Sequence, residues 1–254
     1  MQKNTAVIIL AAGYGKRLGG EHQKTLTKIF GKPLLYYLLQ TVKKCNPERI
    51  IVVVGFQKER VMEELAGEHV IFVEQTQLLG TGHAVMTGMD ALSDFNGNVF
   101  ILCGDIPFIT LGTIKKIKKI HDETSADCTL LTAIVENPYG YGRIKRNGNG
   151  AIEKIIEEAN ATSEEKQIKE INAGIYIFNK EKLFQSLHKI NLNPVKKEYY
   201  LTDVVELLIK QGRTVSTWTT PMPEETLGIN TPQDLMRAKQ YFLCFRRPKF
   251  RSRK

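Results

Sequence analysis

The segment LAAGYGKRLGGEHQKTL, residues 10–26, is rich in glycine and in basic residues, and it follows the apolar run Ala6–Leu10. It carries three basic side chains, Arg17 and Lys24 among them, and one acidic side chain. Backbone N–H groups without side chains in the way and cationic side chains both attract an anion, so together they favour binding of a phosphate group. The segment therefore predicts a phosphate-binding loop at the end of a first strand.

Three kinds of phosphate-binding loop could account for this segment, and a solvated turn is a fourth interpretation. The dinucleotide fingerprint G-x-G-x-x-G fails because Leu18 stands where its third glycine belongs. The P-loop pattern fails because Glu21 takes the position of its lysine. The remaining kind holds a nucleoside triphosphate directly, with Arg17 and Lys24 on the phosphates. It also needs small residues against the base and ribose, here Ala11, Ala12 and Gly13.

Asp105 is a second candidate for phosphate chemistry, because it directly follows the apolar run in NVFILCGD, residues 98–105. Ligands of parallel sheets collect at the carboxyl ends of the strands. A carboxylate at such an end suits a hard cation that keeps waters and binds phosphate oxygens, such as Mg²⁺. The alternative is that Asp105 only caps a turn before Pro107.

Short apolar runs alternate with helical patterns in the first half of the chain, which predicts a buried parallel sheet covered by helices. The expected strands are Ala6–Leu10, Ile50–Val54, Val70–Val73 and Val99–Cys103. The expected helices are Pro33–Lys44, Lys58–Ala66, Gly82–Leu92 and Leu111–His121. Both candidate phosphate sites then lie at carboxyl ends of strands.

The second half of the chain keeps this layout less strictly. Strands are expected at Cys128–Val135, 170–179 and Thr214–Thr219, with a turn and a hairpin within residues 137–158. Helices are expected at Lys180–Lys189, Leu201–Lys210 and Pro232–Leu243. The sequence shows no internal repeat, low-complexity linker or sharp break in composition, so we expect one α/β domain over residues 1–245.

The net charge of +9 is concentrated at the C-terminal end of the chain. Residues 246–254, RRPKFRSRK, hold six of the 36 basic residues and no acidic one, which leaves 30 basic against 27 acidic residues elsewhere. We expect a solvated tail without fixed structure. Contact with RNA, an acidic membrane surface or an acidic partner stays open, although no nucleic-acid motif accompanies the tail.

Nothing in the sequence indicates a membrane or a secreted protein. No apolar run approaches the roughly 20 residues that span a bilayer, and the N-terminal residues lack a signal-peptide cleavage pattern. Cys45, Cys103, Cys128 and Cys244 show no C-x-x-C spacing, which favours structural thiols in a reducing compartment. Cys103 and Cys244 lie in apolar runs, where cysteine packs as a small hydrophobic residue. We expect a cytosolic protein.

Six segments, in order, resemble the pyrophosphorylase domain of bacterial N-acetylglucosamine-1-phosphate uridylyltransferases, which are sugar-phosphate nucleotidyltransferases. They are LAAGYGKRL…QKTL, EQTQLLGTGHAV, LCGDIPFI, NPYGYGRI, EINAGIYIFN and EYYLTD. The resemblance as a whole runs from about Val7 to Leu235, nearly the whole chain. The resemblance implies a Rossmann-like α/β fold with a mostly parallel central sheet, flanking helices and a sugar-binding β-hairpin region.

The resemblance also implies a reaction, in which UTP and N-acetylglucosamine 1-phosphate give UDP-N-acetylglucosamine and pyrophosphate with the help of Mg²⁺. Arg17, Lys24 and Asp105 would be the catalytic residues, and Asn230 would share the metal with Asp105. Two anions must approach each other in this reaction, so catalysis is mainly positioning and neutralisation of charge. No general base is required, because a phosphate monoester dianion is already nucleophilic.

A nucleotide site and a sugar site follow from the same resemblance. Gln75 would read the uracil edge, since an amide offers both a donor and an acceptor, and His83 is expected to be structural. The implied nucleotide-binding residues are Leu10, Ala11, Ala12, Gly13, Lys24, Gln75, Gly80, Thr81, Cys103 and Gly104. The implied sugar-binding residues are Gly142, Glu157, Asn172, Tyr199 and Thr202, with Glu158 as the alternative to Glu157.

The chain departs from the family pattern in two respects. Gln23 stands where a proline commonly precedes the lysine, and the loss of the fixed φ predicts a looser loop. No hexapeptide repeats follow the domain, so we expect no acetyltransferase β-helix and no acetyl transfer. Transfer to another sugar 1-phosphate such as glucose 1-phosphate, cytidylyl transfer to a polyol phosphate, and a nucleotide-sugar sensor without turnover stay open as alternatives.

Overall fold

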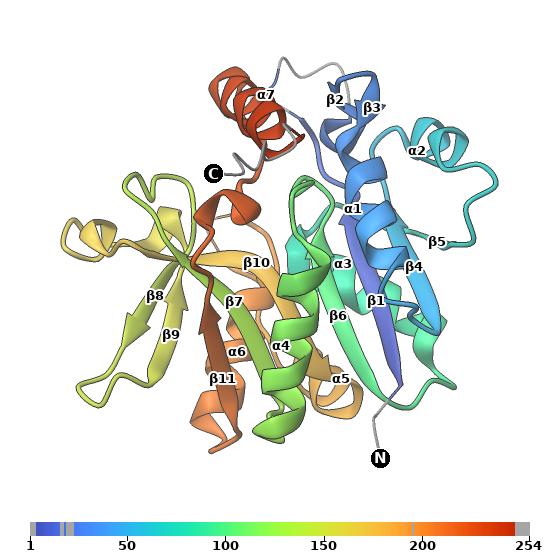
Figure 1. The fold of residues 1–254 in the computed structure, drawn as a ribbon. Coiled ribbons are helices and arrows are strands. Elements are labelled where there is room, and N and C mark those ends of the chain that lie inside the picture. Colours follow the sequence, from blue (N-terminus) through green and yellow to red (C-terminus); the bar gives the residue numbers. More distant parts are fainter. Residues whose placement is uncertain (1–3, 16–17, 19–22, 195, 247–254) are drawn as a thin grey trace, which may run out of the picture.

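The computed structural model describes residues 4–15, 18, 23–194 and 196–246 of the chain. Within these residues a nine-stranded sheet forms the centre of the molecule (Figure 1). Seven of its strands form one continuous path, in the order β11 (Val215–Thr219), β7 (Cys128–Ile134), β10 (Glu170–Asn179), β6 (Asn98–Cys103), β1 (Thr5–Ala11), β4 (Arg49–Val54) and β5 (Ile71–Glu74).

Most neighbours along this path are parallel. The parallel pairs are β1 with β4, β1 with β6, β4 with β5 and β7 with β11. Strand β10 is antiparallel to both of its neighbours, β6 and β7. The expected α/β fold with a mostly parallel sheet is therefore confirmed.

Helices cover both faces of the sheet and give three layers (Figure 1). One face carries α3 (Gly80–Met89), α5 (Lys180–Leu187) and α6 (Leu201–Lys210), and the other carries α1 (Leu34–Lys43), α2 (Lys58–Glu64) and α4 (Leu111–Glu123). Because successive side chains of a strand point to opposite faces, β1 sends Ala6 and Ile8 into one core and Val7 and Ile9 into the other. This explains the apolar runs without polar alternation.

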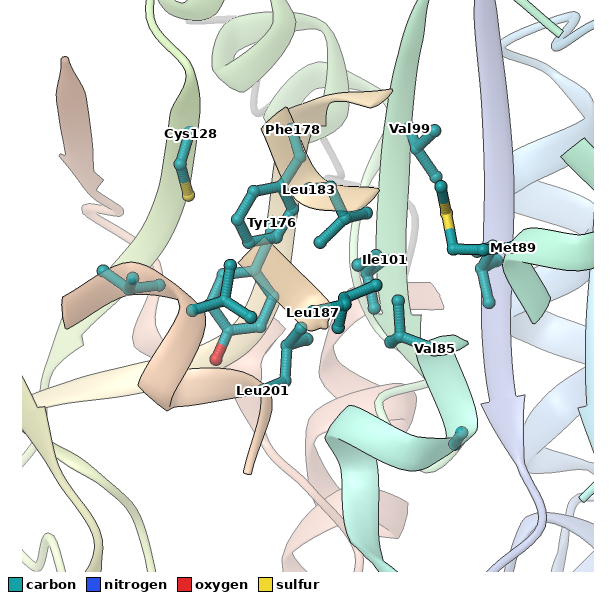
Figure 2. Packing of buried hydrophobic residues seen from close by; sticks show 14 of the residues in the cluster. Val85, Met89, Val99, Ile101, Cys128, Tyr176, Phe178, Leu183, Leu187 and Leu201 are labelled. Atoms are coloured by element: carbon teal, nitrogen blue, oxygen red, sulfur yellow. The ribbon is translucent and has the colours of Figure 1, made fainter. Parts of the chain in front are cut away.

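Figure 2 shows part of the core beneath α3, α5 and α6. On β10 the rings of Tyr176 and Phe178 stack with centroids 5.6 Å apart. Burying one large apolar side chain contributes about 1.5–3 kcal/mol. This core therefore holds α3 and α6 in place, and the first turns of these two helices reach the carboxyl edge of the sheet. The other labelled side chains in this core are Val85, Met89, Val99, Ile101, Cys128, Leu183, Leu187 and Leu201.

A β-hairpin extends the sheet beside β10. Its strands β8 (Arg143–Arg146) and β9 (Ile152–Ile156) are antiparallel, and β8 pairs with β10, so the turn and hairpin predicted within 137–158 are confirmed. The register of β10 shifts at a bulge that contains Gly174, with φ +69°. A Cβ on Gly174 would lie 3.1 Å from the sulfur of Cys103, so glycine lets β10 pass close to the end of β6. Short 3₁₀ turns, η4 (Glu158–Asn160) and η5 (Glu165–Gln167), lead from β9 to β10.

Helix α7 (Pro232–Arg246) lies beside the small hairpin of β2 (Lys28–Ile29) and β3 (Lys32–Pro33) at the carboxyl edge of the sheet (Figure 1). The ring of Phe242 lies 5.0 Å from that of Phe30 and 5.3 Å from that of Tyr37. Helix α7 extends past the predicted end at Leu243 and includes Arg246, the first residue of the tail that was predicted to lack fixed structure, so that prediction is wrong at Arg246. The rest of the predicted tail, residues 247–254, lies outside the described residues. The remaining 3₁₀ turns are η2 (Lys24–Leu26), η3 (Asp90–Leu92) and η6 (Pro223–Thr226).

The four cysteines are free thiols. Burial raises the pKa of Cys103 to about 12 and that of Cys128 well above its usual value, so both thiols stay protonated and unreactive. Cys244 is exposed on α7, so the expectation that it packs as a small hydrophobic residue is wrong. The helix turns Phe242 toward the hairpin and leaves Cys244 outside. Among the described residues, no helix is long and apolar enough to cross a membrane.

Candidate active site

A cavity of about 680 Å³ opens at the carboxyl ends of β1 and β6. Its walls come from the glycine-rich segment, the first turn of α3, the chain before α6 and Asn230, which lies just before α7. Much of the predicted nucleotide set lines this cavity, namely Leu10, Ala12, Gly13, Lys24, Gln75, Gly80, Thr81 and Cys103. The predicted metal ligands Asp105 and Asn230 line it as well.

Lys24, Asp105 and Asn230 come from three distant segments and meet on one wall. The Nζ atom of Lys24 lies 2.5 Å from Oδ2 of Asp105 and 3.0 Å from Oδ1 of Asn230. The side chains of Lys24 and Asp105 are 23% and 12% exposed, so they are shielded from most of the solvent and face the cavity. Arg17, the other predicted catalytic residue, lies outside the described residues.

Hydrogen bonds fix Asn230 beside Asp105. The backbone N–H of Ile229 donates to the carbonyl of Asp105 at 3.1 Å, which docks the two segments. The side-chain Nδ2 of Asn230 donates to the carbonyl of Gly228 at 3.2 Å, so its Oδ1 is the atom left to face a cation. The carboxylate of Asp234 accepts the N–H of Asn230 at 3.1 Å and so joins this segment to the first turn of α7.

Gln23 holds the segment just before Lys24. It is fully buried, and its φ of −60° is close to the value that a proline ring imposes. Its side-chain amide donates to the carbonyl of Ala11 and accepts from the N–H and the hydroxyl of Thr25, the latter two at 2.5 and 2.7 Å. Its own N–H donates to Oε1 of Gln57 at 3.0 Å. The prediction of a looser chain is therefore wrong at Gln23 itself, while residues 19–22 lie outside the described part.

Two further members of the predicted nucleotide set lie just behind the wall. The side chain of Ala11 is buried at the end of β1. The N–H of Gly104 donates to the carbonyl of Leu10 at 2.9 Å. A Cβ on Gly104 would lie 2.9 Å from both that carbonyl oxygen and Cγ2 of Thr25. Glycine is thus required for the close approach of the β1 and β6 ends.

The start of α3 forms the opposite wall. Gln75 is buried, and its Nε2 donates to the carbonyl of Gly80 at 3.1 Å and contacts Nδ1 of His83 at 2.9 Å. Gly80 has φ +90°, and a Cβ there would lie 2.7 Å from the carbonyl oxygen of Tyr199, so no other residue fits without strain. The hydroxyl of Thr81 accepts the first N–H of α6 at 3.1 Å. His83 supports Gln75, which agrees with a structural role.

Glu157 reaches the cavity from the end of β9. The hydroxyl of Thr202 donates to its Oε1 at 2.8 Å from behind the wall. Burial raises the pKa of Glu157; the Thr202 hydrogen bond opposes this rise, and the charge of Glu198 adds to it. Glu158, the alternative, instead pairs with the buried Arg143 at 2.6 Å. Of the two glutamates, Glu157 is the one that lines the cavity.

The remaining predicted sugar-binding residues are outside the set that lines the cavity. Asn172 donates through Nδ2 to the hydroxyl of Tyr176 at 2.6 Å and accepts the N–H of Gly174 at 3.1 Å, so both ends of its amide have partners within β10. The carbonyl of Gly142 accepts the N–H of Asn172 at 2.8 Å in the same region. The backbone of Tyr199 bonds to the first turn of α3 and the residue before it.

Sequence reasoning missed eight lining residues, which are Tyr14, Gly15, Thr25, Leu78, Ala84, Lys196, Glu198 and Tyr200. Glu198 and Tyr200 belong to the segment EYYLTD, so the motif located this wall without showing which side chains face the cavity. Tyr14 packs against Phe56 with ring centroids 4.6 Å apart. No motif marks Lys196.

Charged side chains lie at both ends of the cavity. Lys24 and Asp105 pair at the glycine-rich end, and Glu157, Glu198 and Lys196 line the cavity from the end of β9 and the chain before α6. In the first turn of α6, burial raises the pKa of Asp203 to about 6, and the charges of Glu206 and Glu157 add to this rise. A cationic side chain suits phosphates, and carboxylates that accept hydrogen bonds suit a polyhydroxylated molecule.

Asp105 and Asn230 fit the requirements of a magnesium site. They present two oxygen atoms to one cation, the ammonium group of Lys24. Mg²⁺ prefers oxygen ligands and commonly binds through one or two protein groups while it keeps waters or takes phosphate oxygens. Among the described residues, no cluster of three or more His, Cys, Asp and Glu side chains could hold a metal. Waters or a substrate would therefore have to complete the coordination.

A mostly parallel sheet with a cationic, glycine-lined cavity at its carboxyl edge defines a nucleotide-binding α/β protein. The family model described as "Nucleotidyl transferase" matches residues 6–221, and the chain belongs to this family. A candidate glucose-1-phosphate thymidylyltransferase from Bacillus anthracis, solved with sucrose, has the same fold. Its TM-score is 0.76 at 19% identity, over 93% of this chain and 94% of that chain.

Two curated relatives carry the name "Bifunctional protein GlmU". The chain is 45% identical over 241 residues to that of Caldicellulosiruptor saccharolyticus, which covers 94% of this chain and 52% of the relative. It is 41% identical over 237 residues to that of Halalkalibacterium halodurans, which covers 93% of this chain and 52% of the relative. The chain thus spans about half the length of the curated relatives it matches.

Proposed function

We propose that the chain transfers a uridylyl group from UTP to N-acetylglucosamine 1-phosphate and releases pyrophosphate. The observation that carries the proposal is the convergence of Lys24, Asp105 and Asn230 on one wall of the cavity. Membership of the nucleotidyl transferase family and the similarity to GlmU proteins support the reaction class. The six segments that resemble uridylyltransferases support the choice of base and sugar.

The chemistry needs charge neutralisation more than proton transfer. An oxygen of the sugar phosphate attacks the α-phosphorus of UTP in line, and the bond from that phosphorus to the oxygen bridging toward the β-phosphate breaks. The electron pair of that bond leaves with pyrophosphate. Lys24, with Arg17 by resemblance, neutralises the phosphate oxygens as charge develops. Asp105 and Asn230 would hold Mg²⁺, which supplies further positive charge to phosphate oxygens when bound.

Gln75 can select the base through its amide oxygen. Its Nε2 is directed to the carbonyl of Gly80 and to His83, which leaves Oε1 as the group that can accept a hydrogen bond. Uracil carries an N–H at position 3, whereas cytosine carries an acceptor there. The orientation of Gln75 therefore favours a uridine nucleotide over a cytidine nucleotide.

Glu157 and Tyr200 are proposed to line the sugar end. The carboxylate of Glu157 can accept hydrogen bonds from sugar hydroxyls while Thr202 holds it in place. Tyr200 and Glu198 line the same end of the cavity. We place the protein in the cytosol, because its four free thiols suit a reducing compartment.

The decisive experiment measures pyrophosphate release from UTP and Mg²⁺ with N-acetylglucosamine 1-phosphate and, in parallel, with glucose 1-phosphate. The variant Asp105→Asn removes the carboxylate charge at the site, and Asp94→Asn serves as a matched control because Asp94 pairs with Arg49 away from the cavity. Rapid release with the acetylated sugar that is lost only in Asp105→Asn supports the proposal. Release with glucose 1-phosphate alone would refute the sugar assignment. UTP binding without release for any sugar would indicate a sensor.

A further inference from the structure

We propose that Lys24 is the resident counter-cation of the Asp105–Asn230 pair, and that a divalent metal binds there only by displacing its ammonium group. The proposal rests on the proposed function in one respect, the assignment of Asp105 and Asn230 as metal ligands. It adds a second role for Lys24, which neutralises Asp105 before the metal arrives and becomes available to phosphates afterwards.

The first observation is that Lys24 bonds to both predicted metal ligands at once. Its Nζ contacts Oδ2 of Asp105 at 2.5 Å and Oδ1 of Asn230 at 3.0 Å. A metal ligated by these two atoms would lie about 2.0–2.1 Å from each of them. A dication and an ammonium group so close to the same two oxygens repel each other strongly, because the partly buried site screens charge less than water does.

The second observation is that the surrounding chain restricts where a second cation can go. A Cβ on Gly228 would lie 3.2 Å from Nδ2 of Asn230, 3.6 Å from Oδ2 of Asp105 and 4.0 Å from the hydroxyl of Tyr141. The backbone of Gly228, whose N–H donates to the hydroxyl of Tyr141 at 3.3 Å, therefore closes one side of the pair. The hydrogen bond from Nδ2 of Asn230 to the carbonyl of Gly228 also keeps the amide oriented with Oδ1 toward Lys24.

The third observation is that the backbone of Lys24 is held while its side chain can swing. Gln23 is buried and bonded on both sides, and the carbonyl of Lys24 accepts the N–H of Thr27 at 3.1 Å. The lysine stem has four methylene groups with rotatable bonds, so the ammonium group can move while this base stays fixed. Displacement from Asp105 therefore moves the ammonium group within the cavity that Lys24 lines, without unfolding the turn.

A thermodynamic consequence follows from the shared oxygens. Lys24 competes with a metal that arrives alone, so it weakens binding of the metal to the free protein. A bound triphosphate attracts the displaced ammonium group, so metal and nucleotide each strengthen the binding of the other by the same factor. The lysine thereby favours loading of the metal together with its nucleotide.

The test is the affinity of the nucleotide-free protein for Mn²⁺, a paramagnetic substitute for Mg²⁺, measured by electron paramagnetic resonance. We compare the wild type with Lys24→Met, Asp105→Asn and Lys196→Met. Lys196 lines the same cavity, so its variant removes the same charge without freeing the oxygen pair. We expect Lys24→Met to bind Mn²⁺ about ten-fold more tightly than the wild type, the effect of releasing one charge-assisted contact. Lys196→Met should change the affinity by less than about two-fold, since a rim charge is well screened.

Several outcomes would overturn the proposal. Equal Mn²⁺ affinity in wild type and Lys24→Met, with binding lost in Asp105→Asn, would leave the metal site in place and refute the exchange. An equal gain in Mn²⁺ affinity in Lys24→Met and Lys196→Met would mean that any loss of positive charge near the cavity favours the metal, and it would refute a specific exchange at Lys24. Binding unaffected by Asp105→Asn would refute the metal site itself. Failure of the uridylyl-transfer assay with the exchange intact would refute only the proposed reaction, so the two failures are distinguishable.

A second measurement uses the wild-type protein and so avoids any question of variant folding. Acetylation of Lys24 by a small acylating reagent is followed by mass spectrometry with and without Mg²⁺, and Lys196 serves as the internal reference. Displacement from Asp105 exposes the amine, so we expect the acetylation rate of Lys24 relative to Lys196 to rise several-fold with metal. A constant ratio would refute the exchange.

Discussion

The replacement of Gln23 by alanine is the sharpest test of how the glycine-rich segment is held. The alanine variant removes the partner of three buried groups, which are the carbonyl of Ala11 and the N–H and hydroxyl of Thr25. A buried polar group without a partner costs about 1–3 kcal/mol. Because relaxation and entering water recover part of that cost, we expect Gln23→Ala to lower the free energy of unfolding by about 3 kcal/mol.

The same change should also affect turnover, because Lys24 is the next residue. The side chain of Gln23 accepts the N–H of Thr25 and so caps the short 3₁₀ turn that carries Lys24. A displacement of about 1 Å at a catalytic group can cost a factor of about 100 in rate. We expect kcat for pyrophosphate release to fall by about ten-fold or more, while KM for UTP changes less.

The assay combines urea denaturation with steady-state kinetics, and two variants accompany Gln23→Ala. Gln185→Ala is the control, because Gln185 is an exposed glutamine that bonds only to the exposed Glu181 among the contacts that the structure describes, and it should stay within about 0.5 kcal/mol of the wild type. Gln23→Glu keeps an acceptor for Thr25, but its ionised carboxylate cannot donate to Ala11 and places a buried negative charge beside that carbonyl, so it should be at least as destabilised as Gln23→Ala. A Gln23→Ala variant as stable and as active as Gln185→Ala would refute the bridging role of Gln23.

Three further predictions concern single residues. Burial raises the pKa of Asp203 to about 6, so its protonated form is favoured in the folded state; stability should fall as pH rises from about 4 to about 6. Asp203→Asn should flatten the dependence of stability on pH and raise the free energy of unfolding by about 1 kcal/mol at pH 7, allowing for solvent screening. Urea melts across pH 3–8 measure this dependence, and a variant whose profile runs parallel to that of the wild type would contradict the prediction. Glu225→Ala should lower the free energy of unfolding, measured by urea melts, by about 2–3 kcal/mol, because the buried carboxylate accepts hydrogen bonds from Thr113 at 2.5 Å and from Thr110 at 3.3 Å. A decrease below about 1 kcal/mol would contradict this prediction. Gly80→Ala should weaken UTP binding in calorimetry and destabilise the fold, because its φ is +90° and a Cβ would clash with Tyr199, whereas Gly148→Ala, which meets nothing within 4 Å, should match the wild type.

The sequence predicted the parallel half of the sheet well because those strands are buried on both faces. The runs at β1, β4 and β6 are apolar throughout, and the structure places their ends within one residue of the predicted ones. The edge strand β5 is shifted by one residue and leaves Ile71 42% exposed, since it has a neighbour on one side only. The direction and place of β10 were beyond local patterns, because its insertion between β6 and β7 depends on pairings far apart in the sequence.

The same distinction applies to the site: some of its residues follow from local sequence patterns, and others depend on contacts between distant segments. The proposed phosphate end is predictable because glycines and cations cluster in one segment and Asp105 follows shortly after a strand. The sugar end is not, because which of Tyr199 and Tyr200 faces the cavity depends on how the chain turns into α6. The role of Gln23 was also hidden, since its partner Gln57 lies in another segment and Ala11 lies twelve residues earlier in the chain. A missing proline says nothing about the hydrogen bonds that can replace it.

The end of β6 shows how closely Asp105, the proposed metal ligand, is positioned by its neighbours. Cys103 packs against the bulge of β10 at Gly174, and Gly104 lets the carbonyl of Leu10 approach to hydrogen-bonding distance. Asp105 then presents its side chain to the cavity while its carbonyl accepts the N–H of Ile229. Three successive residues thus join β10, β1 and the segment before α7 at one point. Because each contact uses backbone atoms or a space too small for a Cβ, a shift of any one of these elements moves Asp105 relative to Lys24 and Asn230.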